Sequence, residues 1–153
     1  PQMNISIPMN EFNKEYVYFH VPIPNTIIEN SSFRRIVYSS NDFTLNSIHL
    51  YFELSEVEVK QFYNKYKCSF RNQILNDMIS NVEKDVLTQV HIIDKTPCYN
   101  ITNQVNNNFL KMFLTHYTSN YKGPMSFILK ISGIWESQTN YGVTYKFVDV
   151  LPI

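Results

Sequence analysis

The residues with the strongest chemical pattern lie between positions 60 and 71, in the run KQFYNKYKCSFR. Four cations are interleaved with four aromatic rings, and the run contains no acidic residue. Cations neutralise phosphates and ring faces stack on bases, which is the combination that proteins binding single-stranded nucleic acid use. We therefore expect contacts to nucleic acid from Tyr63, Lys65, Tyr66, Lys67 and Arg71. The competing interpretation is an ordinary strand with core rings and solvated lysines.

A second group of cations and rings lies towards the C-terminus. No acidic residue occurs between Lys95 and Trp135. Here we expect nucleic-acid contacts from Lys130, Trp135, Tyr141, Tyr145 and Lys146, the lysines facing phosphates and Trp135 and Tyr141 stacking on bases. A lone Trp at a strand end is equally typical of a plug that fills the open end of a barrel.

Sequence patterns for catalysis or metal binding are missing. The four histidines are isolated, and neither HxH, HExxH nor CxxC occurs. The three glycines cannot form a phosphate-binding loop. The basic run could lower the pKa of the Cys68 thiol, but a buried, inert thiol is favoured because no His or acid is nearby. We therefore expect binding rather than catalysis, with no metal and no cofactor.

Length and charge bound the class of protein. A chain of 153 residues suits one domain, so we expect residues 1–153 to fold as a single unit. The net charge is zero, but residues 1–58 hold three basic and seven acidic residues, and 59–153 hold ten and six. This asymmetry favours a basic face. Only two cysteines, no signal-like segment and no apolar run of about 18 residues together predict an intracellular protein without a membrane span.

The elements before residue 110 are predicted from periodicity. Strands are expected at 15–23, 33–38 and 46–54, the last with Ile48, Leu50, Phe52 and Leu54 on one buried face. Residues 57–70 fit either an extended or a helical segment. The clearest helix spans 72–90, with Ser69 as its N-cap and a buried stripe of Ile74, Met78, Val82 and Val86. Residues 94–108, with Pro97 and three successive asparagines, read as a loop.

Residues 125–150 give the strongest strand pattern in the chain. Two strands, 125–136 and 141–150, are joined by the polar turn 137–140 as a hairpin. Alternation places Phe127, Leu129, Ile131, Gly133 and Trp135 on one face of the first strand. This order of elements predicts an α+β fold: an antiparallel β-barrel or strongly curved, OB-like sheet with one long helix and a C-terminal hairpin.

Three segments carry a resemblance to a known group of proteins: FILKISGIWE at 127–136, YGVTYKF at 141–147 and YNKYKC at 63–68. Together they resemble small single-stranded-DNA-binding proteins with an OB-like fold, encoded by AT-rich large DNA viruses of eukaryotes and related mobile elements. The similarity covers mainly residues 60–150. It implies binding of single-stranded DNA in viral-type DNA replication or repair, in the nucleus or cytoplasm of a host cell.

Two hypotheses for function follow from the sequence. The first is non-catalytic binding of single-stranded nucleic acid in a basic, aromatic-lined groove, with DNA favoured, RNA left open and homo-oligomers left open. The second is a protein–protein or virion structural module that uses an aromatic sheet face as its interface. Zero net charge counts against the first hypothesis, but a groove needs only local positive charge.

Overall fold

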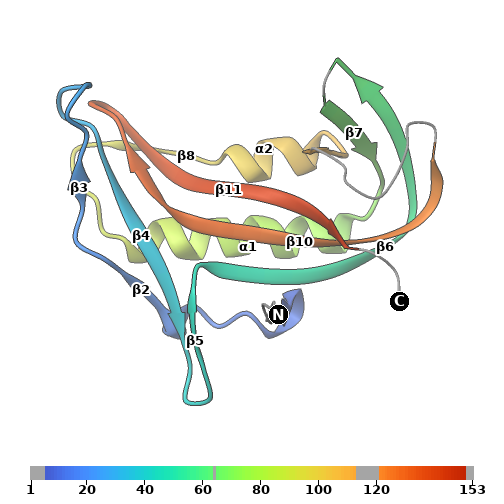
Figure 1. Ribbon diagram of the computed structural model, residues 1–153, viewed down its shortest axis with the longest axis horizontal. Coiled ribbons are helices and arrows are strands. Elements are labelled where there is room, and N and C mark those ends of the chain that lie inside the picture. The colour runs from blue at the N-terminus through green and yellow to red at the C-terminus, as the bar shows by residue number, and fades with distance from the viewer. Residues whose placement is uncertain (1–5, 64, 113–120, 151–153) are drawn as a thin grey trace.

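The computed structural model describes residues 6–63, 65–112 and 121–150. Within these ranges eleven strands form one sheet, and two helices pack against it (Figure 1). The strands are β1 Ile7–Pro8, β2 Val17–Phe19, β3 Ile23–Pro24, β4 Ser32–Ser39, β5 Thr44–Asn46, β6 Ile48–Phe62, β7 Lys65–Ser69, β8 Thr96–Cys98, β9 Phe109–Met112, β10 Lys122–Glu136 and β11 Asn140–Val150. The helices are α1 Gln73–Gln89 and α2 Asn100–Asn106, and two 3-10 turns, η1 Met9–Glu11 and η2 Lys14–Tyr16, lie near the N-terminus.

Strand β10 is the centre of the sheet. Along one edge it pairs antiparallel with β11, as the predicted hairpin requires. Along the other edge it pairs with β6 as far as Ile131, and from Gly133 onwards with β4. Beyond β6 the sheet continues through β7 to β9, and beyond β11 it ends at β8, which runs parallel to its neighbour. The predicted strands at 33–38 and 46–54 are confirmed, and of the residues 57–70, which fitted either an extended or a helical segment, 57–62 and 65–69 are strand.

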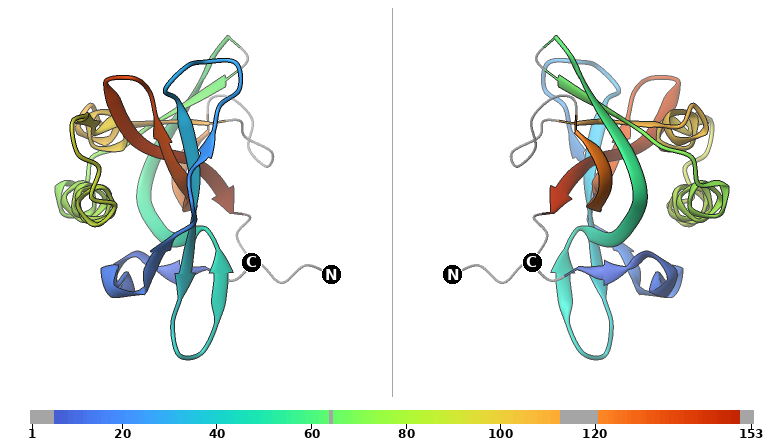
Figure 2. Two further views of the ribbon diagram at one scale, coloured as in Figure 1. Left: turned by 90° about the vertical axis from the view of Figure 1, so that its left-hand side faces the viewer. Right: turned by 90° about the vertical axis from the view of Figure 1, so that its right-hand side faces the viewer.

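The core lies on one face of this sheet. The four apolar residues predicted to share the buried face of β6 do so, each at most 5% exposed. Phe127 and Phe147 face them from β10 and β11, with ring centroids 5.5 and 6.2 Å from that of Phe52. Both helices lie together against this face, and no helix of the described residues covers the opposite face (Figure 2). We call that opposite face the outer face.

The predicted barrel is wrong. Strands β9 and β11 approach each other, but no ladder joins them in the described part of the chain, so the sheet stays open. Both α1 and α2 contact β11, and α2 also contacts β9, so the helices cover the gap that a closing ladder would bridge. The fold is therefore mostly antiparallel sheet, and its helical content is small, since the helices have 17 and 7 residues.

Helix α1 begins and ends within one residue of its predicted bounds, but two details differ. Ser69 belongs to β7, and the N-cap is Asn72, whose side chain accepts a hydrogen bond from Leu75 N–H at 3.0 Å. Ile74 is 77% exposed, so the predicted stripe is wrong at its start. The buried stripe is Leu75, Ile79, Val82 and Val86, with Met78 half-buried beside it.

The predicted loop at 94–108 is also wrong, because it contains β8 and α2. The cause lies elsewhere in the sequence. Glu83 of α1 is fully buried, and its carboxylate accepts hydrogen bonds from the backbone N–H groups of Ile101 and Thr102 at 3.0 and 2.8 Å. The Thr102 hydroxyl donates a third at 2.7 Å. Glu83 therefore accepts hydrogen bonds from the free N–H groups in the first turn of α2, whose own N-cap residue makes no side-chain cap.

An irregularity between Ile131 and Gly133 shifts the register of β10 against β11. Strict alternation had placed Gly133 and Trp135 with Ile131 on the buried face. After the shift Ile134 is buried instead, and Trp135 turns to the outer face. A bulge inserts one residue and so exchanges the faces for every later position.

Candidate nucleic-acid interface

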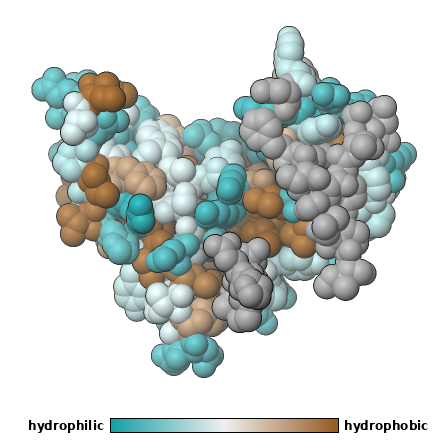
Figure 3. All heavy atoms as spheres, viewed as in Figure 1, coloured by the Kyte–Doolittle hydropathy of each residue, from teal (hydrophilic) through white to brown (hydrophobic). Residues whose placement is uncertain are grey.

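Three rows of side chains cross the outer face at the end of the sheet where β4 replaces β6. In each row the residues are direct partners on neighbouring strands. The rows are Phe33–Trp135–Gly142, Arg35–Gly133–Thr144 and His49–Lys130–Lys146. They combine two aromatic rings with three full cations, and they contain no carboxylate. Figure 3 views the molecule from this side. We call this surface the ring-and-cation face.

The two rings on this face lie against glycines. A β-carbon on Gly142 would fall 2.7 Å from the Trp135 indole, and one on Gly133 would fall 2.3 Å from the Phe33 ring. The rings thus occupy the space that any other residue would fill, close to the backbone of the sheet. Both are half-buried, so part of each ring reaches solvent. A half-exposed ring held on a rigid sheet is the kind of platform on which a base stacks.

The cations of this face stand close to one another. Lys130 and Lys146 are direct cross-strand partners, and like charges in that position destabilise a sheet. Neither forms an ion pair with a carboxylate of the described residues. Arg35, on the next row, is exposed. A phosphate bound between these side chains would relieve their repulsion.

A small hollow adjoins the Phe33 ring of β4. Its volume is about 200 Å³, and Phe33, Arg35, His20, Asn46 and Ser132 are among its lining residues. These side chains offer a ring, a cation and several hydrogen-bonding groups in one concave space. Such a mixture suits a polar planar group such as a nucleobase.

Tyr141 and Tyr145 do not lie on this face, so the structure does not group them with the other predicted base-stacking and binding residues. Both point to the core side of β11: Tyr141 is 8% exposed, and Tyr145 packs edge-on against Phe147 at 5.9 Å. Burial raises the pKa of both phenols. The physical reason is that successive side chains of a strand point to opposite faces, so these two tyrosines point away from the face that carries Lys146, although they are close to it in sequence.

The basic run at 60–71 is divided between two faces. Lys65 and Lys67 are exposed on β7, whereas Tyr66, predicted as a stacking residue, points to the core side and is half-buried against it. Tyr63 is 85% exposed at the tip of the β6–β7 hairpin. The β6–β7 hairpin lies at the opposite end of the sheet from the C-terminal end of β10, which carries Trp135 (Figure 1). The two predicted groups therefore do not form one compact site.

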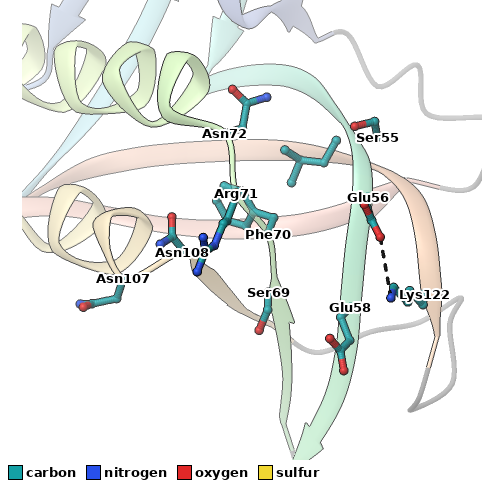
Figure 4. A pocket seen from close by; sticks show the side chains of 11 residues that line it. Ser55, Glu56, Glu58, Ser69, Phe70, Arg71, Asn72, Asn107, Asn108 and Lys122 are labelled. Carbon is teal, nitrogen blue, oxygen red and sulfur yellow. Dashed lines mark ion pairs between the residues drawn. The ribbon is translucent and has the colours of Figure 1, made fainter.

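Arg71 lies in a different hollow, of about 570 Å³, between the β6–β7 hairpin and the ends of the helices (Figure 4). Its neighbours there include Glu56, Glu58, Asn72 and Asn108. Lys122 and Glu56, which also line this hollow, form an ion pair at 3.8 Å. With two carboxylates on its wall, this hollow is a poorer phosphate site than the ring-and-cation face.

Glu136 fixes the end of the hairpin beneath the rings. It points to the core side and accepts hydrogen bonds from Arg34, Ser32 and Lys95 at 2.9, 2.9 and 3.2 Å. Burial alone would raise the pKa of this carboxyl, but the three donors together hold the pKa below its ordinary value. This cluster joins β4, β10 and the segment after α1, so it positions the strands that carry Phe33 and Trp135.

The other candidate groups are the Cys68 thiol and possible metal ligands. Cys68 is fully buried, and burial raises the pKa of its thiol to about 12, with the charge of Asp149 adding to the effect. This agrees with the favoured interpretation of an inert thiol. Within residues 6–63, 65–112 and 121–150, no three His, Cys, Asp or Glu side chains gather as metal ligands would. His116 lies outside these ranges.

Phe33, Arg35 and His49 were not predicted from the sequence. They come from strands far from residue 60 and the hairpin, and only the pairing of β4 and β6 with β10 brings them together. One pattern could have indicated them: Phe33-Arg34-Arg35 alternates as a strand, with two cations in a half of the chain that is otherwise acidic.

Neither helix, in the part of the chain that the structure describes, is long and apolar enough to cross a membrane.

Comparison with known proteins does not assign this chain to a family. No family model matches the sequence, and searches among curated proteins and solved structures return no match either. The resemblance to viral single-strand binders therefore stays a prediction.

Proposed function

We propose that the protein binds single-stranded nucleic acid, preferably DNA, along the outer face of its sheet and catalyses no reaction. One observation carries the proposal: Phe33 and Trp135 lie on glycines beside a cluster of Arg35, Lys130 and Lys146 without an acid among them. Bases would stack on the two rings while the backbone phosphates follow the cations. Such a role suits an intracellular protein of DNA replication or repair.

A single strand fits this surface better than a duplex does. The rings are part of a sheet face rather than a projecting helix, and they offer stacking area rather than a donor and acceptor pattern for base edges. Paired bases hide their faces inside the duplex, whereas unpaired bases can stack on aromatic side chains. We therefore expect a preference for single strands with little dependence on base sequence.

Fluorescence anisotropy of labelled oligonucleotides tests the proposal. Wild-type protein should bind a 20-nucleotide single strand at about 50 mM salt, with an affinity that falls as salt rises. Trp135→Ala should weaken binding by about 1–3 kcal/mol and leave the salt slope nearly unchanged, because a ring has been lost and no charge. The absence of single-strand binding by the wild type at that salt concentration would rule out the proposal.

A matched control variant is Val148→Ala, which also shortens an apolar side chain on the outer face of β11. Val148 lies beyond Lys146, away from the rings, and is 37% exposed. Its loss should leave affinity unchanged. If both variants weaken binding equally, the rings have no special role.

One observation favours the second hypothesis, a protein–protein module. The segment around β3 presents four aliphatic side chains to solvent: Val21, Ile23, Ile27 and Ile28, which are 58–90% exposed. Exposed apolar groups this close together are typical of contact surfaces. Size-exclusion chromatography with light scattering tests this candidate, since Ile27→Ser and Ile28→Ser should dissociate any oligomer that the wild type forms.

A further inference from the structure

Three lysines form a row across the far end of the outer face. Lys67 of β7 is the direct partner of Lys60 on β6 and of Lys111 on β9. All three are exposed, and the row behind them on the core side is Val59, Cys68 and Leu110, all fully buried. The lysines therefore stand side by side on the outer face, and we call them the lysine row.

This row is electrostatically unfavourable as it stands. Like charges directly opposite each other destabilise neighbouring strands. Lys60 forms an ion pair with Glu58 at 3.4 Å, but no described carboxylate lies within ion-pair distance of Lys67 or Lys111. Their partner is the Phe109 ring, whose centroid is 4.6 Å from the Lys67 ammonium and 5.7 Å from that of Lys111. Two ammonium groups over one ring are held close together and remain open to an anion.

The lysine row and the ring-and-cation face share the same side of one continuous strand, with the exposed side chains of Glu53 and Glu58 on that side between them. From His49, in the row of Lys130, to Lys60 is eleven residues of β6. At about 3.3 Å per residue the path along the strand is at most about 36 Å. A four-nucleotide strand has too few phosphates to occupy both ends, whereas 20 nucleotides exceed the span even at about 3.4 Å per nucleotide.

We propose that Lys60, Lys67 and Lys111 form a second phosphate-contact site for the same nucleic-acid strand, reached only by strands long enough to extend from the rings along the outer face. This inference rests on the proposed function and adds a length requirement to it. Short strands occupy the ring-and-cation face alone. Longer ones gain affinity and additional salt dependence from the lysine row.

The test compares two strand lengths and two double variants. Lys67→Gln with Lys111→Gln removes two charges from the row, and Lys14→Gln with Lys84→Gln removes two exposed charges elsewhere. Each protein is titrated with a 4-nucleotide and a 20-nucleotide poly-dT strand at several salt concentrations, with the fluorescence of Trp135, the single tryptophan, as the readout. Circular dichroism and thermal unfolding verify that each variant is folded.

We expect the row variant to bind the 4-nucleotide strand as the wild type does. Its slope of log K against log salt for the 20-nucleotide strand should be flatter by about 1.4, from two contacts at about 0.7 each. The ratio of the wild-type affinity to the row-variant affinity for the 20-nucleotide strand should therefore fall about sevenfold between 50 and 200 mM salt. The control double variant should match the wild type for both strands.

The outcomes separate the two proposals. If the row variant binds both lengths as the wild type does, or weakens both equally, the lysine row is not a length-dependent site, although the proposed function stands. If the wild type binds neither strand, the proposed function fails and this inference fails with it.

Discussion

The two faces of the β10–β11 hairpin differ in what their aromatic residues do. On the core face, Phe127 and Phe147 both pack against Phe52 of β6, and Tyr145 packs against Phe147. On the outer face, Trp135 lies on a glycine with part of its ring in solvent, beside cations. The two sets are interleaved in one stretch of sequence, so aromatic content alone does not indicate binding. The face on which a ring lies decides between packing and stacking.

The largest effect is expected from Phe127→Ala, on the core face. Phe127 is fully buried and stacks on Phe52, so its loss leaves a cavity and should lower the free energy of unfolding by about 3–5 kcal/mol. Urea unfolding measures this. The remaining folded protein should bind nucleic acid normally. An unfolding free energy close to that of the wild type would contradict the assignment of this face to the core.

Gly142→Ala is expected to affect both stability and nucleic-acid binding. The added β-carbon would meet the Trp135 indole at 2.7 Å, so the ring must move, at a cost of about 1–3 kcal/mol in unfolding free energy. Because the platform is displaced, affinity for single strands should fall as well. Thermal unfolding and anisotropy measure the two effects. If affinity is unchanged in a destabilised protein, the position of the ring does not matter for binding.

Glu136→Gln is expected to have an effect that depends on pH. The folded-state pKa of Glu136 is below its ordinary value, so its contribution to stability is present above about pH 4.3 and is lost as pH falls through the folded pKa. At pH 7 the variant should lose about 1–3 kcal/mol of unfolding free energy. Urea unfolding at pH 7 and in acid should show the difference from wild type shrinking as the pH falls. A constant difference would mean that the ionised carboxylate is not what matters.

Lys130→Gln should have the smallest effect on stability and a specific effect on binding. Removing one of two facing lysines relieves repulsion, so the unfolding free energy should stay within about 0.5 kcal/mol of wild type. The slope of log K against log salt should become flatter by about 0.7. An unchanged slope would remove Lys130 from the phosphate contacts.

Alternation predicted much of the sheet from the sequence. Period two identified β4, the first part of β6 and both strands of the hairpin, and the spacing of apolar residues identified α1. Alternation failed at β10, where the bulge between Ile131 and Gly133 exchanges the two faces; the isolated glycine there is a signal of a bulge that alternation does not use. It also failed at α2, because the group that completes its first turn is Glu83, 18 residues away.

The candidate site was predictable only in part. Lys130, Trp135 and Lys146 were identified from the sequence and do lie on one face. Tyr141, Tyr145 and Tyr66 were grouped with the lysines by composition, although a period of two places Tyr145 and Tyr66 on the opposite side of the strand from the lysines next to them. Phe33, Arg35 and the partnership of Lys60 with Lys111 through Lys67 depend on strand pairing between distant segments, which local patterns do not encode.

The most direct test of the central claim uses Trp135, because it is the single tryptophan of the chain and lies at the centre of the proposed platform. Its intrinsic fluorescence is followed while a 20-nucleotide single strand is added, with anisotropy of a labelled copy as an independent measure of binding. Stacking of a base on the indole predicts saturable quenching with the same midpoint as the anisotropy. Binding detected by anisotropy with no change in Trp135 fluorescence would contradict the claim that the strand lies on this face.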